Sequence, residues 1–294
     1  MGGYYGAKLS MAGHEVYFVA RGEHLASIKR DGLVVESFNG DFTVRPAGSS
    51  EHFERMGGVD LVLVCVKRGD TADALGAIAG QVENETVVIS LQNGLDADKE
   101  MAAVVEPSRI VGGIAFIGSA VSAPGRIRHT ARGVVTIGEA DGSQSERVLK
   151  IQKTFEDAGI PCAVSPDIVG AKWDKLMWNV GFNGVCALTR GTVHKVLDHA
   201  PTADLARSLM EELVGVADEL GINVNRSLVD KYIVNTRKGG DVTPSTLQDV
   251  MHGKRTEIKY MNGKVCEEGR KTGYPTPYND AVFALVSALD EMRK

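Results

Sequence analysis

Two periods of hydrophobic residues divide the chain into an alternating stretch and a helical stretch. Up to about residue 140, short apolar runs rich in β-branched residues alternate with segments of helical spacing. Such alternation predicts a largely parallel sheet with helices between its strands. The predicted helices cover residues 2–13, 22–32, 71–82 and 95–105, and the predicted strands cover 14–21, 32–37, 41–47, 59–67 and 86–94.

The two longest apolar runs indicate the kind of sheet. Residues 59–67 and 86–94 are typical of parallel strands that are buried on both faces. Residues 32–37 and 41–47 flank the sequence FNG and predict a hairpin. The pattern as a whole predicts an α/β fold with a doubly wound sheet of the Rossmann type.

The pattern changes near residue 110. Three consecutive strands are predicted over 110–121, 125–131 and 133–139, as an antiparallel extension of the sheet. A helix over 143–159 and a strand over 160–166 follow, and nearly all later residues have helical period. We therefore expect a dinucleotide-binding domain at 1–165 and an all-helical domain at 166–294.

The composition excludes several classes of protein. Of the 294 residues, 43% are hydrophobic and 24% are charged, with a net charge of −5. An acidic chain has no general electrostatic reason to bind nucleic acid or an anionic membrane. No signal-peptide layout and no membrane-spanning apolar run is found, so we expect a cytoplasmic protein. The widely spaced cysteines predict free thiols, and neither they nor the histidines form a metal-binding pattern, so no metal is expected.

The N-terminus resembles the end of a dinucleotide-binding motif. In G-x-G-x-x-G the third glycine allows close packing of helix on strand, and Gly2 in MGGYYGAKL fits that position. The first strand and the first two glycines would then be absent. Because that strand is central in such sheets, its loss would expose two apolar edges. We expect that the chain is trimmed at its start or that its start is misassigned.

The residues that follow two predicted strands suggest the choice of cofactor. Arg21 stands about 20 residues after the motif, where an acid would bind the ribose 2′-hydroxyl of NAD. An arginine there suits the 2′-phosphate of NADP, since it forms charge-assisted hydrogen bonds. Lys67 adds a second cation at the same edge of the sheet. The alternative for Arg21 is a solvated surface arginine.

Polar residues that are suited to catalysis lie in two further segments. Asn93 ends a predicted buried strand, where ligands gather in open α/β sheets, although Asn-Gly is also a common turn. In AKWDKLMWNVGFNG, helical spacing places Lys175, Asn179 and Asn183 on one stripe with Lys172. Lys175 stands between two tryptophans, and burial would lower its pKa. A surface lysine whose stem covers the tryptophans is the alternative.

The segment 243–265 contains the last candidates. Ser245 and Gln248 have the spacing of a helix capping box. Glu257 shares a helical stripe with Met261, Lys264 and Glu268. It is a hydrogen-bond acceptor for a hydroxyl, one half of a pair with a basic residue, or a solvated glutamate.

These motifs together resemble the ketopantoate reductases (2-dehydropantoate 2-reductases). The resemblance extends over nearly the whole chain, and its most specific parts are the K-x-x-x-N-x-x-x-N helix and T-E-I-x-Y-x-N-G. It implies a Rossmann domain, a helical domain and an active site in the cleft between them. It also implies NADPH-dependent reduction of 2-dehydropantoate to pantoate, on the route to pantothenate and coenzyme A.

The resemblance also implies roles for individual residues. Lys175 corresponds to the general acid and Glu257 to the substrate-binding glutamate, and both Glu257 and Asn93 are expected near cofactor and substrate. Gly2, Arg21 and Lys67 correspond to cofactor-binding residues. The remaining substrate-binding positions correspond to Asn93, Asn179, Asn183 and Ser245.

The role of two glycines in the segment 171–184 and the identity of the substrate are hypotheses. Gly181 and Gly184 weaken a helix, and we expect them to let substrate or nicotinamide approach closely. The expected partner is a small 2-oxo acid, with a homodimer as a possible assembly. Two alternatives remain: a reductase for another branched 2-oxo or 3-hydroxy acid, and a non-catalytic NADP(H)-binding sensor or structural remnant.

Overall fold

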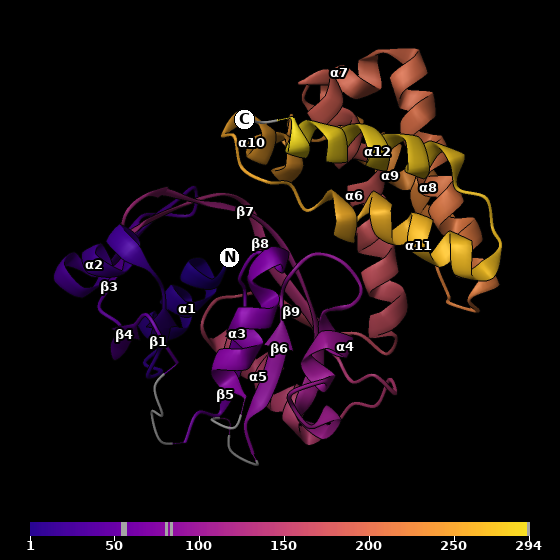
Figure 1. Cartoon of the computed structure of the whole chain (residues 1–294). Coiled ribbons are helices and arrows are strands. Elements are labelled where there is room, and N and C mark those ends of the chain that lie inside the picture. The colour runs from indigo at the N-terminus through magenta and orange to yellow at the C-terminus, as the bar shows by residue number, and fades with distance from the viewer. Residues whose placement is uncertain (54–57, 80–81, 83–84, 293–294) are drawn as a thin grey trace. The chain divides into compact units, whose positions relative to one another are not determined.

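The computed structural model describes residues 1–53, 58–79, 82 and 85–292 (Figure 1). The chain forms two compact units. The first comprises Met1–Gln92 and Asp96–Ile168, and the second comprises Asn93–Leu95 and Val169–Lys294. The short segment Asn93–Leu95 therefore belongs with the second unit, although its neighbours along the chain belong to the first.

The strands of the first unit form two sheets among the described residues. The larger has seven strands in the order β3-β2-β8-β7-β6-β5, with β9 beside β8, and the smaller pairs β1 with β4. The pairs β2–β3 and β7–β8 are antiparallel, and the other pairs are parallel. The strands are β1 (Tyr17–Val19), β2 (Leu33–Ser37), β3 (Phe42–Val44), β4 (Gly48–Ser50), β5 (Leu61–Val64), β6 (Val87–Ser90), β7 (Ile110–Ala123), β8 (Arg126–Gly138) and β9 (Cys162–Val164).

The predicted α/β fold and the hairpin β2–β3 are confirmed, but two strand predictions are wrong. The segments 125–131 and 133–139 form one strand, β8, because positive φ angles at Arg132 and Gly133 bend it without ending it. β5 is only partly buried, with Val64 alone fully buried, although burial on both faces was expected. Within the described residues β5 pairs with β6 only and β1 with β4 only, so each has one unpaired edge.

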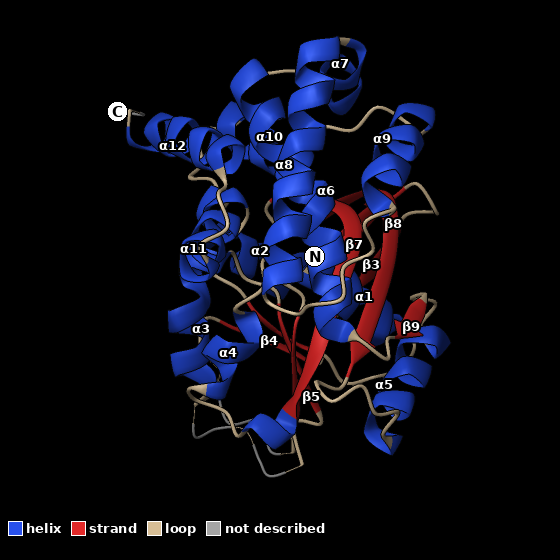
Figure 2. Cartoon of the chain, turned by 90° about the vertical axis from the view of Figure 1, so that its right-hand side faces the viewer, coloured by secondary structure: helices blue, strands red, loops and turns tan. Residues whose placement is uncertain are grey.

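Helices cover the sheets of the first unit and close its core (Figure 2). In α1 a Cβ at Gly6 would lie 2.5 Å from Cε1 of Phe18, so glycine permits the helix to approach β1. The predicted helix 71–82 is shorter in the structure, and its residues 80–81 lie outside the described part of the chain. The helices are α1 (Gly2–Met11), α2 (Gly22–Asp31), α3 (Thr71–Ile78), α4 (Ala97–Ala102) and α5 (Glu146–Asp157), with 3₁₀ turns η1 (Arg68–Asp70) and η2 (Pro107–Arg109).

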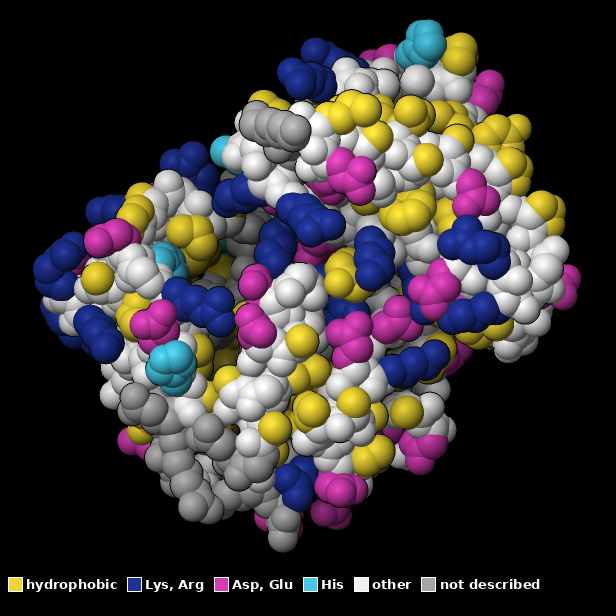
Figure 3. Space-filling view, viewed as in Figure 1, with side chains coloured by type: hydrophobic (Ala, Val, Ile, Leu, Met, Phe, Trp, Pro, Cys, Tyr) yellow, Lys and Arg dark blue, Asp and Glu magenta, His cyan; other side chains and the backbone are white. Residues whose placement is uncertain are grey.

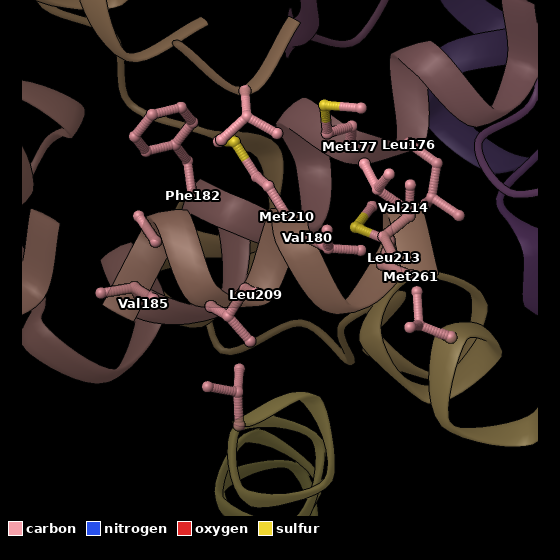
Figure 4. Close-up of a cluster of buried hydrophobic side chains, with 14 of the residues drawn as sticks. Leu176, Met177, Val180, Phe182, Val185, Leu209, Met210, Leu213, Val214 and Met261 are labelled. Carbon is pink, nitrogen blue, oxygen red and sulfur yellow. The ribbon is translucent and has the colours of Figure 1, made fainter. Parts of the chain in front are cut away.

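In the second unit the described residues form helices and no strands (Figure 2). Its core packs the apolar side of α6 (Ile168–Thr189) against α8 (Ala200–Glu219). Figure 4 shows Leu176, Met177 and Val180 of α6 with Met210 and Leu213 of α8. The helices are α6 (Ile168–Thr189), α7 (Val193–Asp198), α8 (Ala200–Glu219), α9 (Leu228–Lys238), α10 (Ser245–Met251), α11 (Asn262–Thr272) and α12 (Pro277–Glu291), with the 3₁₀ turn η3 (Ile258–Tyr260).

The glycines of α6 have a packing role, so the hypothesis that they admit substrate or nicotinamide is wrong. A Cβ at Gly181 would lie 2.2 Å from Cε of Met210 on α8. A Cβ at Gly184 would lie 2.3 Å from Cγ1 of Val282 on α12. At both positions glycine lowers the helix propensity of α6 but allows a neighbouring helix to pack closely against it.

We expect Gly181→Leu to destabilise the second unit rather than to block hydride transfer. Overpacking a well-packed core typically costs about 1–3 kcal/mol and occasionally more. Chemical denaturation should show the loss as a lower midpoint. Gly76→Leu is the matched control, because it lies inside α3 with nothing within 4 Å of its Cβ position. Equal stability of the two variants would contradict the packing role.

The surface mixes both signs of charge, and α12 adds apolar side chains to it. Lys, Arg, Asp and Glu are interspersed on the face shown in Figure 3, and hydrophobic side chains follow α12. Tyr278, Leu285 and Met292 are exposed, whereas Val282 and Val286 on the same segment are buried. α12 is therefore apolar on its outer as well as its inner side. Among the described helices none has an apolar stretch that could cross a bilayer.

Candidate active site

The polar stripe of α6 is the first part of the candidate site. Lys175, Asn179 and Asn183 occupy successive turns of one uninterrupted helix, as their spacing predicts. Lys175 is partly buried, while Asn179 is 7% and Asn183 is 1% exposed. Burying two amides is unfavourable unless they find partners. These positions are therefore unusual for a helix whose opposite side packs the core.

Asn93 connects Lys175 to Glu257. The Lys175 ammonium donates a hydrogen bond to Oδ1 of Asn93 over 3.0 Å, and Nδ2 of Asn93 donates to Oε2 of Glu257 over 3.4 Å. The structure thus brings together a cation, an amide and a carboxylate that are far apart in the sequence, all within the second unit. We call these three residues the Lys–Asn–Glu chain.

The turn after β6 brings Asn93 to its partners. Gly94 has φ +92°, a left-handed conformation that glycine adopts without strain. A Cβ there would lie 3.0 Å from the carbonyl oxygen of Tyr260 in η3. Gly94 therefore provides both the turn and the close approach. The two interpretations of Asn93, as a turn residue and as a site residue, are compatible with each other.

Glu257 is held by the elements on both sides of it. It directly precedes η3, and its backbone carbonyl accepts a hydrogen bond from the Tyr260 amide. The preceding Thr256 donates through its hydroxyl to Asp290 on α12, over 2.6 Å. The predicted helical stripe is wrong for Glu257, which lies outside α11. Its part from Lys264 to Glu268 is confirmed, because these two residues of α11 form an ion pair over 2.7 Å.

Burial makes the Lys175 ammonium more acidic than that of an exposed lysine. Desolvation lowers its pKa from 10.5 to about 8; the neighbouring Glu257 carboxylate raises it, and Lys172 lowers it further. A lysine with this pKa gives up a proton near neutral pH far more readily than an exposed lysine. The arrangement therefore suits Lys175 to proton transfer.

The structure places Ser245 at the start of α10, without the predicted capping box. Pro244 occupies the N-cap position, so Ser245 is the first helical residue. Gln248 donates its side-chain amide to the Thr243 carbonyl instead. The capping prediction fails because a spacing of three residues does not show which residue begins the helix.

Some features of the site carry no recognisable sequence signal. The Asn183 amide donates to Sδ of Met261, over 3.1 Å. Among the described residues, Nδ2 of Asn179 and Oδ1 of Asn183 are buried without a hydrogen-bond partner. Unsatisfied buried polar atoms are rare and call for an explanation, and a bound ligand is one.

The candidate cofactor residues lie in the first unit. Gly2 begins α1 close to the end of β5, because a Cβ there would lie 3.0 Å from Cβ of Cys65. Lys67 is exposed at the start of η1, two residues beyond Cys65. Arg21 is exposed at the N-cap of α2, after β1 of the smaller sheet. The structure thus brings Gly2 near the segment that leads to Lys67.

A buried arginine that the sequence did not single out fixes the turn after β5. Arg68 is 2% exposed and pairs with Glu100 over 2.5 Å. Gln92 donates to the Val66 carbonyl and to the Thr71 hydroxyl. This network holds the segment around Lys67 in place. No cluster of metal-ligating side chains is found in the part of the chain that the structure describes.

Comparison with known proteins identifies the family. Residues 1–142 match the family described as ketopantoate reductase PanE/ApbA, and residues 167–290 match its C-terminal part. The curated 2-dehydropantoate 2-reductase of Mesorhizobium japonicum is 33% identical, over 98% of this chain and 94% of that protein.

Solved structures agree with the sequence comparison. The PanE/ApbA family ketopantoate reductase from Ralstonia eutropha has a TM-score of 0.92 at 29% identity, covering 99% of this chain and 96% of that chain. The 2-dehydropantoate 2-reductase from Geobacter metallireducens has a TM-score of 0.91 at 32% identity, covering 97% and 95%. The chain therefore belongs to the ketopantoate reductase family of oxidoreductases.

Proposed function

We propose that this protein reduces 2-dehydropantoate to pantoate with NADPH, and that Lys175 is the general acid. The observation that carries the proposal is the Lys–Asn–Glu chain, in which burial lowers the pKa of Lys175 to about 8. Relatives that are named 2-dehydropantoate 2-reductase, and that match this chain over more than nine-tenths of their length, support the choice of substrate. The reaction would belong to the route to pantothenate and coenzyme A, in the cytoplasm.

Lys175 would serve the oxygen of the 2-oxo group. An ammonium beside that oxygen stabilises the negative charge that develops on it, and then supplies the proton that completes the alcohol. Asn93 accepts a hydrogen bond from the Lys175 ammonium, so it holds Nζ in a fixed direction before substrate arrives. Preorganisation of this kind spares the cost of reorienting the acid during the reaction.

The other site residues would bind the polar groups of the substrate. Glu257 is 8% exposed, and its carboxylate can accept a hydrogen bond from the 2-hydroxyl that forms in the product pantoate. Asn179 and Asn183 carry the unpartnered amide atoms on the same stripe as Lys175. Ser245 at the start of α10 adds a hydroxyl, and we assign it to the substrate carboxylate.

The residues of the first unit fit a dinucleotide. Gly2 allows α1 to pack closely on the end of β5, as the third glycine of the motif does. The first turn of α1 has no acidic side chain that would repel a phosphate. Arg21 and Lys67 would hold the 2′-phosphate of NADPH. NADPH supplies the hydride when bound.

We expect the rate to depend on pH through Lys175. The general acid must be protonated, so kcat should be constant below pH about 8 and fall about tenfold per unit above it. Glu257→Gln should move this fall to lower pH, because the carboxylate raises the pKa of Lys175. The measurement is a pH profile of kcat with saturating substrates. A shift to higher pH in Glu257→Gln would contradict the assignment.

The test of the proposed function compares two substrates. Purified protein is given NADPH and either 2-dehydropantoate or 3,3-dimethyl-2-oxobutanoate, which lacks the terminal hydroxyl, and NADPH oxidation is followed by absorbance. Preference for 2-dehydropantoate supports the proposal, since a site that binds a hydroxyl leaves polar groups unpaired with the analogue. Equal rates would favour a reductase for another branched 2-oxo acid. NADPH binding without turnover of either would favour the non-catalytic sensor.

A further inference from the structure

Met261 contacts Asn183, the last residue of the polar stripe of α6. It lies immediately before α11, and its side chain is fully buried. Its sulfur accepts a hydrogen bond from Nδ2 of Asn183 over 3.1 Å, and a longer one from the Thr246 hydroxyl over 3.9 Å. The thioether thus connects α6 to the start of α10, where Thr246 follows the candidate substrate residue Ser245.

The sulfur determines which way the Asn183 amide faces. An amide has a donor end and an acceptor end, whereas a thioether can only accept. Asn183 must therefore turn Nδ2 toward Met261, which leaves Oδ1 on the other side. Oδ1 is buried and has no partner among the described residues. A buried carbonyl in this state favours a ligand that brings a donor group to it.

Asn179, one turn earlier, shows the opposite polarity. Its Nδ2 is the buried atom that lacks a partner within the described chain, so it offers a donor. From Lys175 through Asn179 to Asn183, the stripe thus offers donor, donor and acceptor. A 2-oxo acid with a terminal hydroxyl has partners of both kinds, with acceptor oxygens on its oxo and carboxylate groups and a donor at its hydroxyl end.

We propose that Met261 is a positioning residue that determines substrate specificity. By accepting from Nδ2, its sulfur keeps Oδ1 of Asn183 available as the acceptor for the substrate hydroxyl, and so favours hydroxylated 2-oxo acids over analogues without that hydroxyl. The inference rests on the proposed function for its substrate class. It adds a residue that touches neither substrate nor cofactor and acts through Asn183.

Met261→Leu tests the proposal, because it removes the acceptor and nearly conserves volume, a change that cores usually tolerate. Without the sulfur the amide is free to turn its donor end toward the substrate. KM for 2-dehydropantoate is expected to rise about tenfold while kcat changes less than about threefold. KM for 3,3-dimethyl-2-oxobutanoate should stay unchanged, so discrimination falls about tenfold.

Met210→Leu is the matched control. Met210 is a fully buried methionine of the same core cluster (Figure 4). Within the described part of the chain, no polar side chain donates a hydrogen bond to its sulfur. It should leave the discrimination unchanged, while thermal unfolding reports the packing cost of both variants. If Met261→Leu discriminates as well as the unaltered protein, or if both variants lose discrimination equally, the proposal is overturned.

Binding measurements separate this proposal from the proposed function. Calorimetry compares 2-dehydropantoate with the analogue on the unaltered protein and on Met261→Leu, without any need for turnover. Selective binding that Met261→Leu abolishes supports the role of Met261 even if neither acid is reduced, an outcome that would refute the reductase. Turnover with a preference that Met261→Leu leaves intact would refute the role of Met261 and keep the reductase. Equal binding of both acids by the unaltered protein would also refute it.

Discussion

Lys175→Ala is expected to lower kcat by about 10²–10⁴, the range typical for loss of a general acid. Affinity for NADPH should change little, because the candidate phosphate-binding residues Gly2, Arg21 and Lys67 lie in the first unit. Single-turnover kinetics would measure the chemical step, and fluorescence titration would measure NADPH binding. Equal losses in both would point to misfolding or to a binding role for Lys175.

Two further variants separate proton donation from charge. Lys175→Arg keeps a cation but cannot give up its proton at ordinary pH, since the guanidinium pKa exceeds 12. If Lys175 donates the proton, Lys175→Arg should be nearly as slow as Lys175→Ala. Recovery of most of the rate would mean that charge stabilisation alone suffices. Lys231→Ala, an exposed lysine on α9, controls for general loss of positive charge.

Arg21→Asp is expected to reverse the preference between NADPH and NADH. Each charge-assisted hydrogen bond to the 2′-phosphate contributes about 1.5–3 kcal/mol, and an aspartate adds repulsion. The ratio of kcat/KM for the two cofactors should therefore shift by about 100-fold toward NADH. An aspartate also suits the N-cap of α2 better than arginine, so the fold should not suffer.

Arg30→Asp controls for the change in overall charge. Arg30 is exposed in the last turn of α2, and its nearby ion pair is with Asp31. The cofactor ratio should not move in this variant. A ratio that is unchanged in Arg21→Asp as well would mean that Arg21 does not read the phosphate.

Local patterns of the sequence correctly predict the structural features that depend only on residues close together along the chain. The four-residue spacing of Lys175, Asn179 and Asn183 is enough to place them on one side of a helix. The hairpin β2–β3 follows from its turn residues in the same way. These elements form as predicted because backbone geometry alone fixes which side chains share a face.

Long-range packing is where the sequence predictions fail. Gly181 looked like a substrate contact, yet its neighbour is Met210, which only the tertiary structure could reveal. The contact of Asn183 with Met261 joins residues whose spacing carries no signal. The strand β8 was split because a non-glycine residue with positive φ, Arg132, is not recognisable from its residue type.

The small segment Asn93–Leu95 limits how far this protein can be treated as two modules. All residues after Ile168 belong to the second unit. A gene fusion or truncation made there would leave Asn93 on the N-terminal piece, separated from the rest of its unit. The helical piece would then keep Lys175 and Glu257 but lose the amide that joins them. Exchange of whole halves between homologous proteins should therefore respect three junctions rather than one, with Asn93 inherited together with the helices.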